Sequence, residues 1–541
     1  MAGTASDAGK SVLTAGICRW LARQGVRVAP FKAQNMSNNS MVTPDGAEIG
    51  RAQAMQAAAA GVPAEAAMNP VLLKPGSDMS SHLVVLGQPA GEASAVGYWG
   101  SDAGRARLLG TVLDAFDDLR SRFDVVVCEG AGSPAEINLR RHDIVNMGLA
   151  RARGLPVIVV GDIDRGGVFA ALYGTLALLD EADQAHICGF VVNKFRGEGE
   201  LLAPGLLRIA ALTGRPVLGV LPYLRGIWID AEDAVVVERA SGGAVPGSIP
   251  SIIPGSERGS ELGSELGSQL GSELGSELGS GLGGQTLRVA VIRLPRISNF
   301  TDVDALALEP GVAVRYADSP DEVAEADLAV LPGTRATVAD LGWLRDRGLD
   351  VALARRAAAG RAVLGICGGY QMLGAQIRDG IESTAQVVEG LRLLPVTTTF
   401  AAAKVLGRPS GFAGDTPVTG YEIHHGAVRV DGGRPWFTSQ PGGGEHGGGE
   451  PLDGCRVGSV SGTLWHGVFE NDEFRRQYLS EVARGAGRAY VPVPGTSFEA
   501  ARQAQFDMLA DAVEQHLDTG ALLRLIEHGQ TPAMRVLRPG L

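Results

Sequence analysis

The chain has 541 residues and a formal net charge of −12, with 45% hydrophobic but only 5% aromatic residues. This length is enough for about two to four domains, and the acidic balance argues against a nucleic-acid partner bound mainly through phosphates. The N-terminus has no signal-peptide pattern, no apolar run approaches about 18 residues, and the five cysteines form no CxxC pair. We therefore expect a cytoplasmic protein with no membrane span and no disulfide framework.

The first element in chain order is a glycine-bounded loop, GTASDAGKS, followed by the helix-like segment SVLTAGICRWLARQG. Such a loop cradles phosphates with its backbone N–H groups, while its lysine reaches the β- and γ-phosphates and its hydroxyl binds Mg²⁺. Lys10 and Ser11 would take these roles. Five residues separate Gly3 from Gly9, one more than in the common P-loop, and only two residues precede the loop where a strand is expected. Either the start codon is placed late and the first strand is missing, or the sheet lacks a central strand.

Polar and acidic groups follow at the ends of later segments. FKAQNMSNNS, starting at Phe31, predicts a strand end that runs into a polar loop, the usual place for ligand groups in an open α/β sheet. EIGRAQAMQ predicts the start of an alanine-rich helix with Glu48 in its first turn. DVVVCEGAGSP predicts a buried strand that delivers Glu129 to a loop, the arrangement in which P-loop proteins hold Mg²⁺.

Further apolar strands at residues 155–162, 188–194 and 216–221 alternate with helical segments, which is typical of a doubly wound sheet. Residues 241–284 break this pattern with a repeat of Gly, Ser, Glu and Leu. Because a glycine inside a helix costs about 1 kcal/mol, we interpret this segment as a flexible linker, with a marginal amphipathic helix as the alternative. Residues 438–451 form a second glycine-rich insertion.

After the linker the β/α pattern restarts, and the strand-like AVLGI ends at Cys367, which two glycines and a helical segment follow. A cysteine on such a strand-to-helix turn has its sulfur exposed at a helix N-terminus, where a thiolate is favoured. The alternative is a buried cysteine that packs as a small hydrophobic residue. The flanking glycines favour a nucleophile.

A cysteine nucleophile needs a base within hydrogen-bond reach, and a histidine distant in sequence normally supplies it. His466 lies beside a glycine at a strand-to-turn junction, in the same context as Cys367. Its competitors are His424, His425 and His446. We favour His466.

Together these segments resemble known families. GICGGYQMLG with a downstream WHGVFEND resembles the class I glutamine amidotransferases, and LPGT resembles their oxyanion loop. GTASDAGKS, FKAQNMSNNS, EIGRAQAMQ and CEGAGSPAEINL resemble the ATP-dependent amide-forming half of dethiobiotin synthetase and its corrinoid-pathway relatives. In this order they resemble the cobyric acid synthase family of the cobalamin pathway. The resemblance implies two doubly wound α/β domains: an N-terminal P-loop-type ATPase and a C-terminal, flavodoxin-like class I glutamine amidotransferase.

The resemblance also implies roles for individual residues. The expected site residues are the nucleophile Cys367 and its base His466, the oxyanion residues Gly333 and Gly368, the ATP-binding residues Thr4, Asp7, Gly9, Lys10, Ser11 and Lys32, and the Mg²⁺ ligands Ser11, Glu48 and Glu129. Many relatives complete a triad with His-x-Glu, but here Glu470 is four residues after His466. The residue that orients the histidine is therefore unassigned.

The implied reaction is the ATP- and glutamine-dependent amidation of cobyrinic acid a,c-diamide to cobyric acid, with ATP and Mg²⁺ required. Two alternatives stay open: an amide ligase of the same superfamily that acts on another carboxylate, and a P-loop switch ATPase with a non-catalytic C-terminal module. The expected domains are residues 1–240 and 285–541, joined by the linker 241–284.

Overall fold

The computed structural model describes residues 1–75, 80–94, 102–228, 286–383, 386–439, 452–529 and 535–537. The predicted linker 241–284 and residues 440–451 of the predicted insertion lie outside these ranges. The chain divides into two compact units: unit 1 contains Met1–Glu232 and Arg502–Leu541, and unit 2 contains Asp233–Ala501. Each unit is described by itself. Within the described ranges, no helix combines the length and apolar character needed to cross a membrane.

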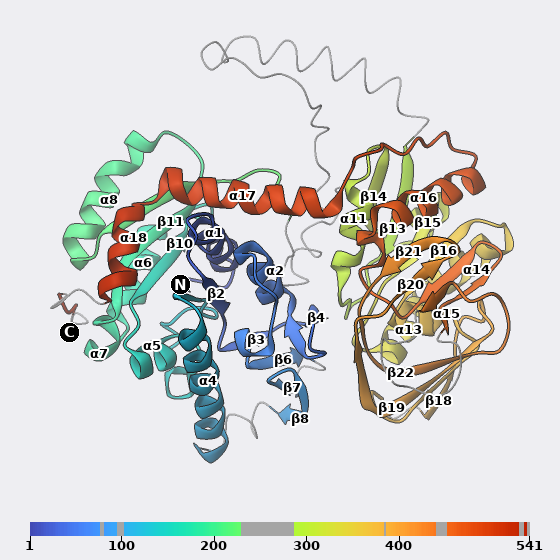
Figure 1. Cartoon of the computed structure of the whole chain (residues 1–541), viewed down its shortest axis with the longest axis horizontal. Helices are drawn as coiled ribbons and strands as arrows, with labels where there is room; N and C mark the ends of the chain where they lie inside the picture. The colour runs from blue at the N-terminus through green and yellow to red at the C-terminus, as the bar shows by residue number, and fades with distance from the viewer. Residues whose placement is uncertain are drawn as a thin grey trace, which may run out of the picture. The chain divides into compact units, whose positions relative to one another are not determined.

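Unit 1 is built on parallel strands whose apolar runs are buried (Figure 1). One sheet has the order β1-β10-β11-β12, and β2 pairs with β9. The bounds are β1 (Ala2–Gly3), β2 (Val28–Phe31), β9 (Val125–Cys128), β10 (Val157–Asp162), β11 (Ile187–Phe195) and β12 (Val217–Pro222). The helices between and around them are α1 (Lys10–Arg23), α2 (Arg51–Ala60), α4 (Asp102–Arg122), α5 (Met147–Arg153), α6 (Val168–Ala177), α7 (Glu181–Gln184) and α8 (Gly199–Thr213).

The two-residue strand β1 resolves the question of the central strand. Ala2 and Gly3 pair in parallel with β10. On the other side, the Met1 ammonium donates a hydrogen bond to the Cys128 carbonyl oxygen (2.6 Å), and the Gly130 N–H donates to the Met1 carbonyl oxygen (2.8 Å). β1 therefore lies between β9 and β10, and the sheet does not lack its central strand.

Smaller sheets in unit 1 carry the polar segment that follows β2. β3 (Gln34–Met36) pairs with β6 (Val71–Pro75), which continues to β7 (Ser80–Val85) and β8 (Gln88–Ser94), and β4 (Ser40–Val42) pairs with β5 (Glu48–Gly50). The prediction that Glu48 lies in the first turn of a helix is wrong. Glu48 lies in β5, and α2 begins at Arg51, because Glu48 pairs across the hairpin with Val42.

Unit 2 contains a sheet of order β14-β13-β15-β16-β26-β25, parallel except for β25. The bounds are β13 (Leu287–Ile292), β14 (Val312–Ala317), β15 (Leu328–Leu331), β16 (Ala362–Ile366), β25 (Cys455–Val457) and β26 (Val460–Thr463). The helices are α11 (Asp304–Leu308), α12 (Pro320–Glu325), α13 (Thr337–Asp346), α14 (Leu349–Ala358), α15 (Gly368–Leu373) and α16 (Asp472–Ala486). The structure confirms the predicted pair of doubly wound α/β domains.

Two smaller sheets complete unit 2. One has the order β18-β17-β19-β22, and the other β21-β20-β23-β24. The bounds are β17 (Gln376–Asp379), β18 (Gln386–Glu389), β19 (Val396–Gly407), β20 (Ser410–Ala413), β21 (Thr416–Thr419), β22 (Glu422–Val430), β23 (Phe437–Ser439) and β24 (Leu452–Asp453).

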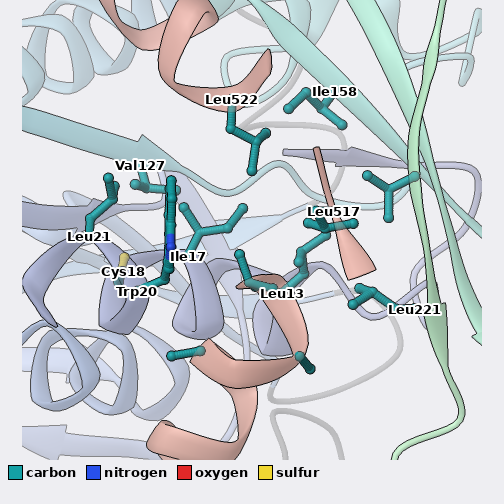
Figure 2. Packing of buried hydrophobic residues seen from close by; sticks show 14 of the residues in the cluster. Leu13, Ile17, Cys18, Trp20, Leu21, Val127, Ile158, Leu221, Leu517 and Leu522 are labelled. Atoms are coloured by element: carbon teal, nitrogen blue, oxygen red, sulfur yellow. The ribbon is translucent and has the colours of Figure 1, made fainter. Parts of the chain in front are cut away.

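The C-terminal segment departs from the predicted domain 285–541, because residues 502–541 belong to unit 1. Helices α17 (Phe498–His516) and α18 (Thr519–His528) supply Val513 and Leu522 to a core that also contains Leu13 and Ile17 of α1. Figure 2 shows Leu13, Ile17 and Leu522 in this core. Gly16 permits this close packing, since a Cβ there would lie 3.0 Å from the carbonyl oxygen of Leu509. The apolar face of α1 therefore packs against the C-terminal helices α17 and α18.

Candidate functional sites

The glycine-bounded loop of unit 1 starts at the carboxyl end of β1, where the Thr4 N–H donates to the Val160 carbonyl oxygen (2.9 Å). Gly9 has a φ of +93°, and a Cβ there would lie 2.1 Å from Nδ2 of Asn193. That amide donates to the Ala8 carbonyl oxygen (2.9 Å), and Lys194 Nζ donates to the Asp7 carbonyl oxygen (2.7 Å). The end of β11 therefore fixes the loop, and only glycine fits at position 9.

Lys10 is buried and turns back over its own loop. Its Nζ donates to the carbonyl oxygens of Ala5 (2.9 Å) and Ser6 (3.0 Å). The Lys10 ammonium is thus held over the loop by two of its carbonyl oxygens. Asp7, predicted beside ATP, pairs through its carboxylate with Arg165.

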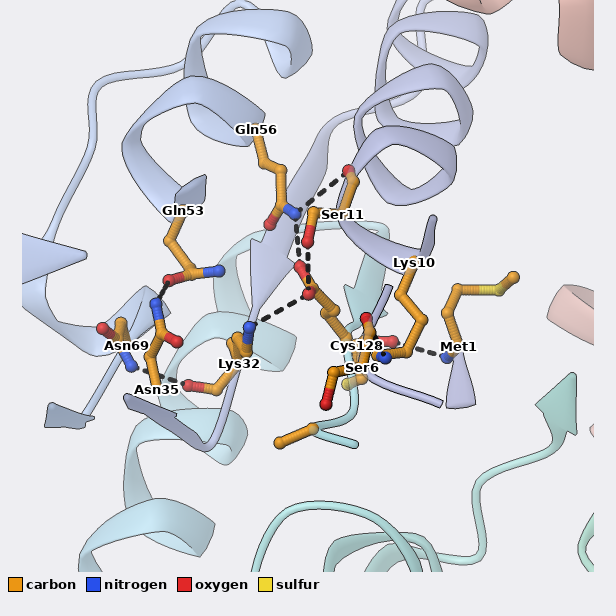
Figure 3. Close-up of polar contacts among 12 residues, drawn as sticks. Met1, Ser6, Lys10, Ser11, Lys32, Asn35, Gln53, Gln56, Asn69 and Cys128 are labelled. Carbon is orange, nitrogen blue, oxygen red and sulfur yellow. Dashed lines mark hydrogen bonds and ion pairs between the residues drawn. The ribbon is translucent and has the colours of Figure 1, made fainter. Parts of the chain in front are cut away.

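Glu129 is the centre of a buried network that joins it to two other predicted residues, Ser11 and Lys32, and to Gln56. Figure 3 shows the side chains of Ser11, Lys32 and Gln56 converging on one place. Its Oε1 accepts from Ser11 Oγ (2.7 Å) and Lys32 Nζ (3.0 Å), and its Oε2 accepts from Gln56 Nε2 (2.5 Å). Burial alone would raise the pKa of Glu129, but the Lys32 charge and the hydrogen bonds from Ser11 and Gln56 lower it overall. The ionised form of the Glu129 carboxylate is therefore favoured, next to the Ser11 hydroxyl.

Glu48 is buried in a different set of contacts. Its Oε1 accepts from Lys74 Nζ (2.6 Å) and Ser40 Oγ (2.9 Å), and Lys74 also donates to Ser40 Oγ (2.7 Å). Glu129 and Ser11 present adjacent oxygen donors that suit Mg²⁺. Glu48 is charge-balanced by Lys74, as Glu129 is by Lys32, and its place among the ligands stays a prediction.

In unit 2, Cys367 occupies the turn between β16 and α15 with a φ of +51° and a ψ of −111°. This left-handed backbone is strained for a residue with a side chain and is typical of functional turns. The Cys367 N–H donates to the Thr463 carbonyl oxygen of β26 (2.8 Å). A Cβ on Gly369 would lie 1.9 Å from the Leu331 carbonyl oxygen, so the turn packs directly on the end of β15.

His466 follows β26 and is buried, and Cys367 lies close enough for its charge to act on the imidazole. Its Nδ1 lies 2.7 Å from Oδ2 of Asp302, its Nε2 lies 3.4 Å from Nδ2 of Asn299, and its ring stacks on Tyr421 with centroids 5.1 Å apart. Burial lowers the pKa of His466, but the charges of Asp302 and Cys367 and their hydrogen bonds raise it overall to about 10.

The competing histidines lie elsewhere. His424 is buried on β22 with Nε2 3.9 Å from Oε1 of Glu422, and a ring nitrogen of His425 lies 3.2 Å from the Ala401 carbonyl oxygen. His446 lies outside the described residues. Among the histidines that the structure describes, His466 is the one whose imidazole is affected by the charge of Cys367, and its role as the base stays a prediction.

The two expected oxyanion residues also meet at this site. A Cβ on Gly333 would lie 3.2 Å from Cε1 of His466, and one on Gly368 would lie 2.7 Å from Cγ2 of Thr334. The loop after β15 therefore touches both the cysteine turn and the histidine. A thiol, an imidazole and a loop with backbone donors in this arrangement suit attack on an amide carbonyl.

Sequence reasoning missed Asp302 and Asn299. Both follow β13, in the segment SNFTDVD, and both are buried. A signal was present, since polar residues directly after a parallel strand lie at the edge of the sheet where ligand groups gather. The segment lacks a recognisable spacing to His466, however, so the contact is visible only in the structure.

Comparison with known proteins finds one family model in the N-terminal part of the chain and another in the C-terminal part. Residues 1–234 match the family model of the CobQ/CobB/MinD/ParA nucleotide binding domain, and residues 288–474 match that of the CobB/CobQ-like glutamine amidotransferase domain. The chain is 62% identical to a protein of Frankia casuarinae and 57% identical to one of Streptomyces avermitilis, both named cobyric acid synthase. Each alignment covers 100% of this chain and 98% of the relative. A solved glutamine amidotransferase structure, 19% identical, matches 37% of this chain and 98% of its own, with a TM-score of 0.30.

Proposed function

Since the chain belongs to the cobyric acid synthase family, we propose that it amidates cobyrinic acid a,c-diamide at its b, d, e and g carboxylates to give cobyric acid. The chain is a glutamine-hydrolysing carbon–nitrogen ligase that binds ATP. The observation that carries the proposal is the full-length identity to these relatives, and the two buried sites supply the chemistry that such a reaction needs.

In unit 2, the Cys367 sulfur attacks the amide carbon of glutamine, and the backbone N–H groups near Gly333 and Gly368 stabilise the oxyanion. The imidazolium of His466 then protonates the nitrogen as the C–N bond breaks, which releases ammonia and leaves a thioester. Neutral His466 next takes a proton from water, whose oxygen attacks the thioester, and glutamate leaves as the sulfur regains its original state. The electrostatic effect of Cys367 on the buried imidazole of His466 supports these roles.

In unit 1, a carboxylate oxygen of the corrinoid attacks the γ-phosphorus of ATP, so that ADP leaves and an acyl phosphate forms. This step is needed because a free carboxylate has no leaving group that ammonia can displace. Ammonia then attacks the acyl carbon, and phosphate leaves as the amide forms. Lys10, together with Thr4, Gly9 and Lys32 of the predicted ATP set, would neutralise and position the phosphates.

Ser11 and Glu129 would hold Mg²⁺, whose role when bound is to neutralise charge on the ATP phosphates. The lowered pKa of Glu129 keeps its carboxylate ionised and able to accept a cation. Lys32 Nζ and Ser11 Oγ both donate to Oε1 of Glu129. The carboxylate therefore already faces one positive charge, which supports its proposed role as a ligand of a cation.

The test is to incubate the full chain with glutamine, ATP, Mg²⁺ and cobyrinic acid a,c-diamide, and to count the amides added by mass spectrometry. We expect glutamate and ADP to form in step with amidation, and a thiol-directed glutamine analogue to block the glutamine-dependent reaction. Amidation of an unrelated carboxylate but not of the corrinoid would favour another ligase of the superfamily. ATP hydrolysis without glutamate release would favour a switch ATPase.

A further inference from the structure

Asp302 uses one carboxylate oxygen on His466 and the other on the residue that follows it. Oδ2 lies 2.7 Å from Nδ1 of the imidazole, and Oδ1 accepts from the Gly467 N–H at 2.9 Å. The side chains of Asp302 and His466 are 5% and 1% exposed, so water does not compete for these bonds. The same carboxylate thus holds both the ring and the backbone just after it.

The segment that carries Asp302 is itself tied to the loop with Gly333. The Ser298 N–H donates to the Gly333 carbonyl oxygen (2.9 Å), and the Arg335 N–H donates to the Arg296 carbonyl oxygen (3.1 Å). Ile297 and Thr334 form an antiparallel bridge between the two segments. Asp302 therefore stands on a backbone that is fixed relative to the rest of the site.

Glu470, the carboxylate nearest in sequence to the usual His-x-Glu position, lies differently. It is half-buried at the end of the 3₁₀ turn Val468–Glu470, and position 468, where the usual motif would place its glutamate, holds a buried valine. Imidazole Nδ1 has one hydrogen-bonding position in the ring plane, and Asp302 takes it. This leaves no ring position for a second carboxylate on that side.

We propose that Asp302 is the positioning residue for His466 and takes the place that a glutamate two residues after the histidine holds in the usual triad. This inference rests on the proposed glutamine hydrolysis and adds the residue that orients its base. An acidic group on Nδ1 fixes the tautomer that presents Nε2 to the thiol and stabilises the imidazolium formed during the reaction.

The direction of the electrostatic effect follows from the neighbours of His466. Asp302 is the carboxylate in contact with the ring, Cys367 is the other group that can carry a negative charge, and Tyr421 and Asn299 contribute neutral contacts. Because the pKa of His466 is raised to about 10, the imidazolium that protonates the departing amide nitrogen persists up to about that pH. Without the Asp302 charge, burial would lower this pKa, and the proton donor would be lost at lower pH.

The experiment compares Asp302→Asn with the matched control Glu470→Gln in the full chain. For Asp302→Asn we expect the glutaminase kcat/KM to fall on the order of 10²-fold or more, and the alkaline limb of its pH profile to move to lower pH. Amidation with ammonium salts should persist, because it does not use His466. For Glu470→Gln we expect a glutaminase rate within about twofold of the wild type and an unmoved alkaline limb.

Wild-type glutaminase activity in Asp302→Asn, or a lost rate with an unmoved alkaline limb, would overturn the proposal. A shift of the alkaline limb of the glutaminase pH profile in Glu470→Gln would also overturn the proposal. A measurement on the wild type does not depend on the folding of a variant: NMR of labelled histidines should show one of the nine imidazoles still protonated above about pH 8. If all nine titrate near the ordinary value, the proposal fails. The glutaminase assay needs no corrinoid, so it tests the role of Asp302 even if the chain amidates a different carboxylate.

Discussion

Each unit buries a carboxylate at the edge of a parallel sheet, but the groups that balance the two charges differ. Glu129 of unit 1 faces Lys32 and two neutral donors, and its pKa is lowered. Asp302 of unit 2 faces His466, and its charge raises the pKa of that imidazole. A lysine keeps its charge near neutral pH, whereas an imidazole can gain and lose a proton. Fixed charge suits the phosphoryl transfer proposed for the first site, and a group that can move a proton suits the glutamine hydrolysis proposed for the second.

The largest effect that separates the two sites is expected from Cys367→Ala. Without the sulfur no thioester can form, so glutamate release and glutamine-dependent amidation should fall to background. Amidation supported by ammonium salts should continue, because unit 1 keeps its charges. Equal loss with both nitrogen donors would contradict the assignment of separate tasks to the two sites.

Glu129→Gln tests the other side of the comparison. The substitution keeps the shape but removes the fixed negative charge, so ATP-dependent amidation should fall on the order of 10²- to 10³-fold with either nitrogen donor. ADP release measures this effect. Basal glutaminase activity is the control and should be unchanged. A defect confined to the glutamine-dependent reaction would show that Glu129 serves unit 2 instead.

Leu509→Ala sharpens the comparison by loosening only the scaffold of unit 1. Leu509 is buried in a cluster with Ala15 and Met55, so we expect a loss of about 2–5 kcal/mol in the free energy of unfolding of this unit. Denaturant should then abolish ATP-dependent activity at a lower concentration than glutaminase activity. The exposed Glu514→Ala on the same helix is the matched control and should change the stability by about 0.5 kcal/mol at most. Parallel loss of both activities would mean that α17 supports unit 2 as well.

The smallest effect concerns the ring that stacks on His466. Tyr421→Leu removes an aromatic contact worth about 0.5–1.5 kcal/mol, so the glutaminase kcat should fall about two- to tenfold. Tyr421→Phe keeps the stacked ring and should stay close to the wild type. If both variants lose the same activity, the phenol hydroxyl rather than the stack supports the imidazole.

The parts of the sites that could be predicted are those written in contiguous residues. The glycine-bounded loop before α1 and the glycine-flanked turn at Cys367 each need an unusual backbone conformation. That need is visible as glycines at fixed positions in a short stretch of sequence. His466 could be chosen over its competitors because its own local context matched that of Cys367. The doubly wound fold followed in the same way, from buried apolar strands that alternate with helices.

The remaining contacts depend on which strands become neighbours, and no short pattern records that. Asp302 and His466 are 164 residues apart and meet because β13, β15, β16 and β26 end at one edge of the sheet. The contact between Lys32 and Glu129 arises in the same way from β2 and β9. The residues that follow Glu48 favour helix, but its pairing in the hairpin of β4 and β5 outweighs that local preference.

The packing of α1 against α17 also sets the order in which the protein can fold. Arg19 pairs with Asp507 across 488 residues of sequence, and the same two helices bury Leu13 with Val513. At a synthesis rate of about 5–20 residues per second, α1 leaves the ribosome roughly 25 to 100 s before its partner exists. During that interval the apolar face of α1 lacks its final cover. The N-terminal half is made first, but it can complete its native core only after the last segment of the chain has been translated.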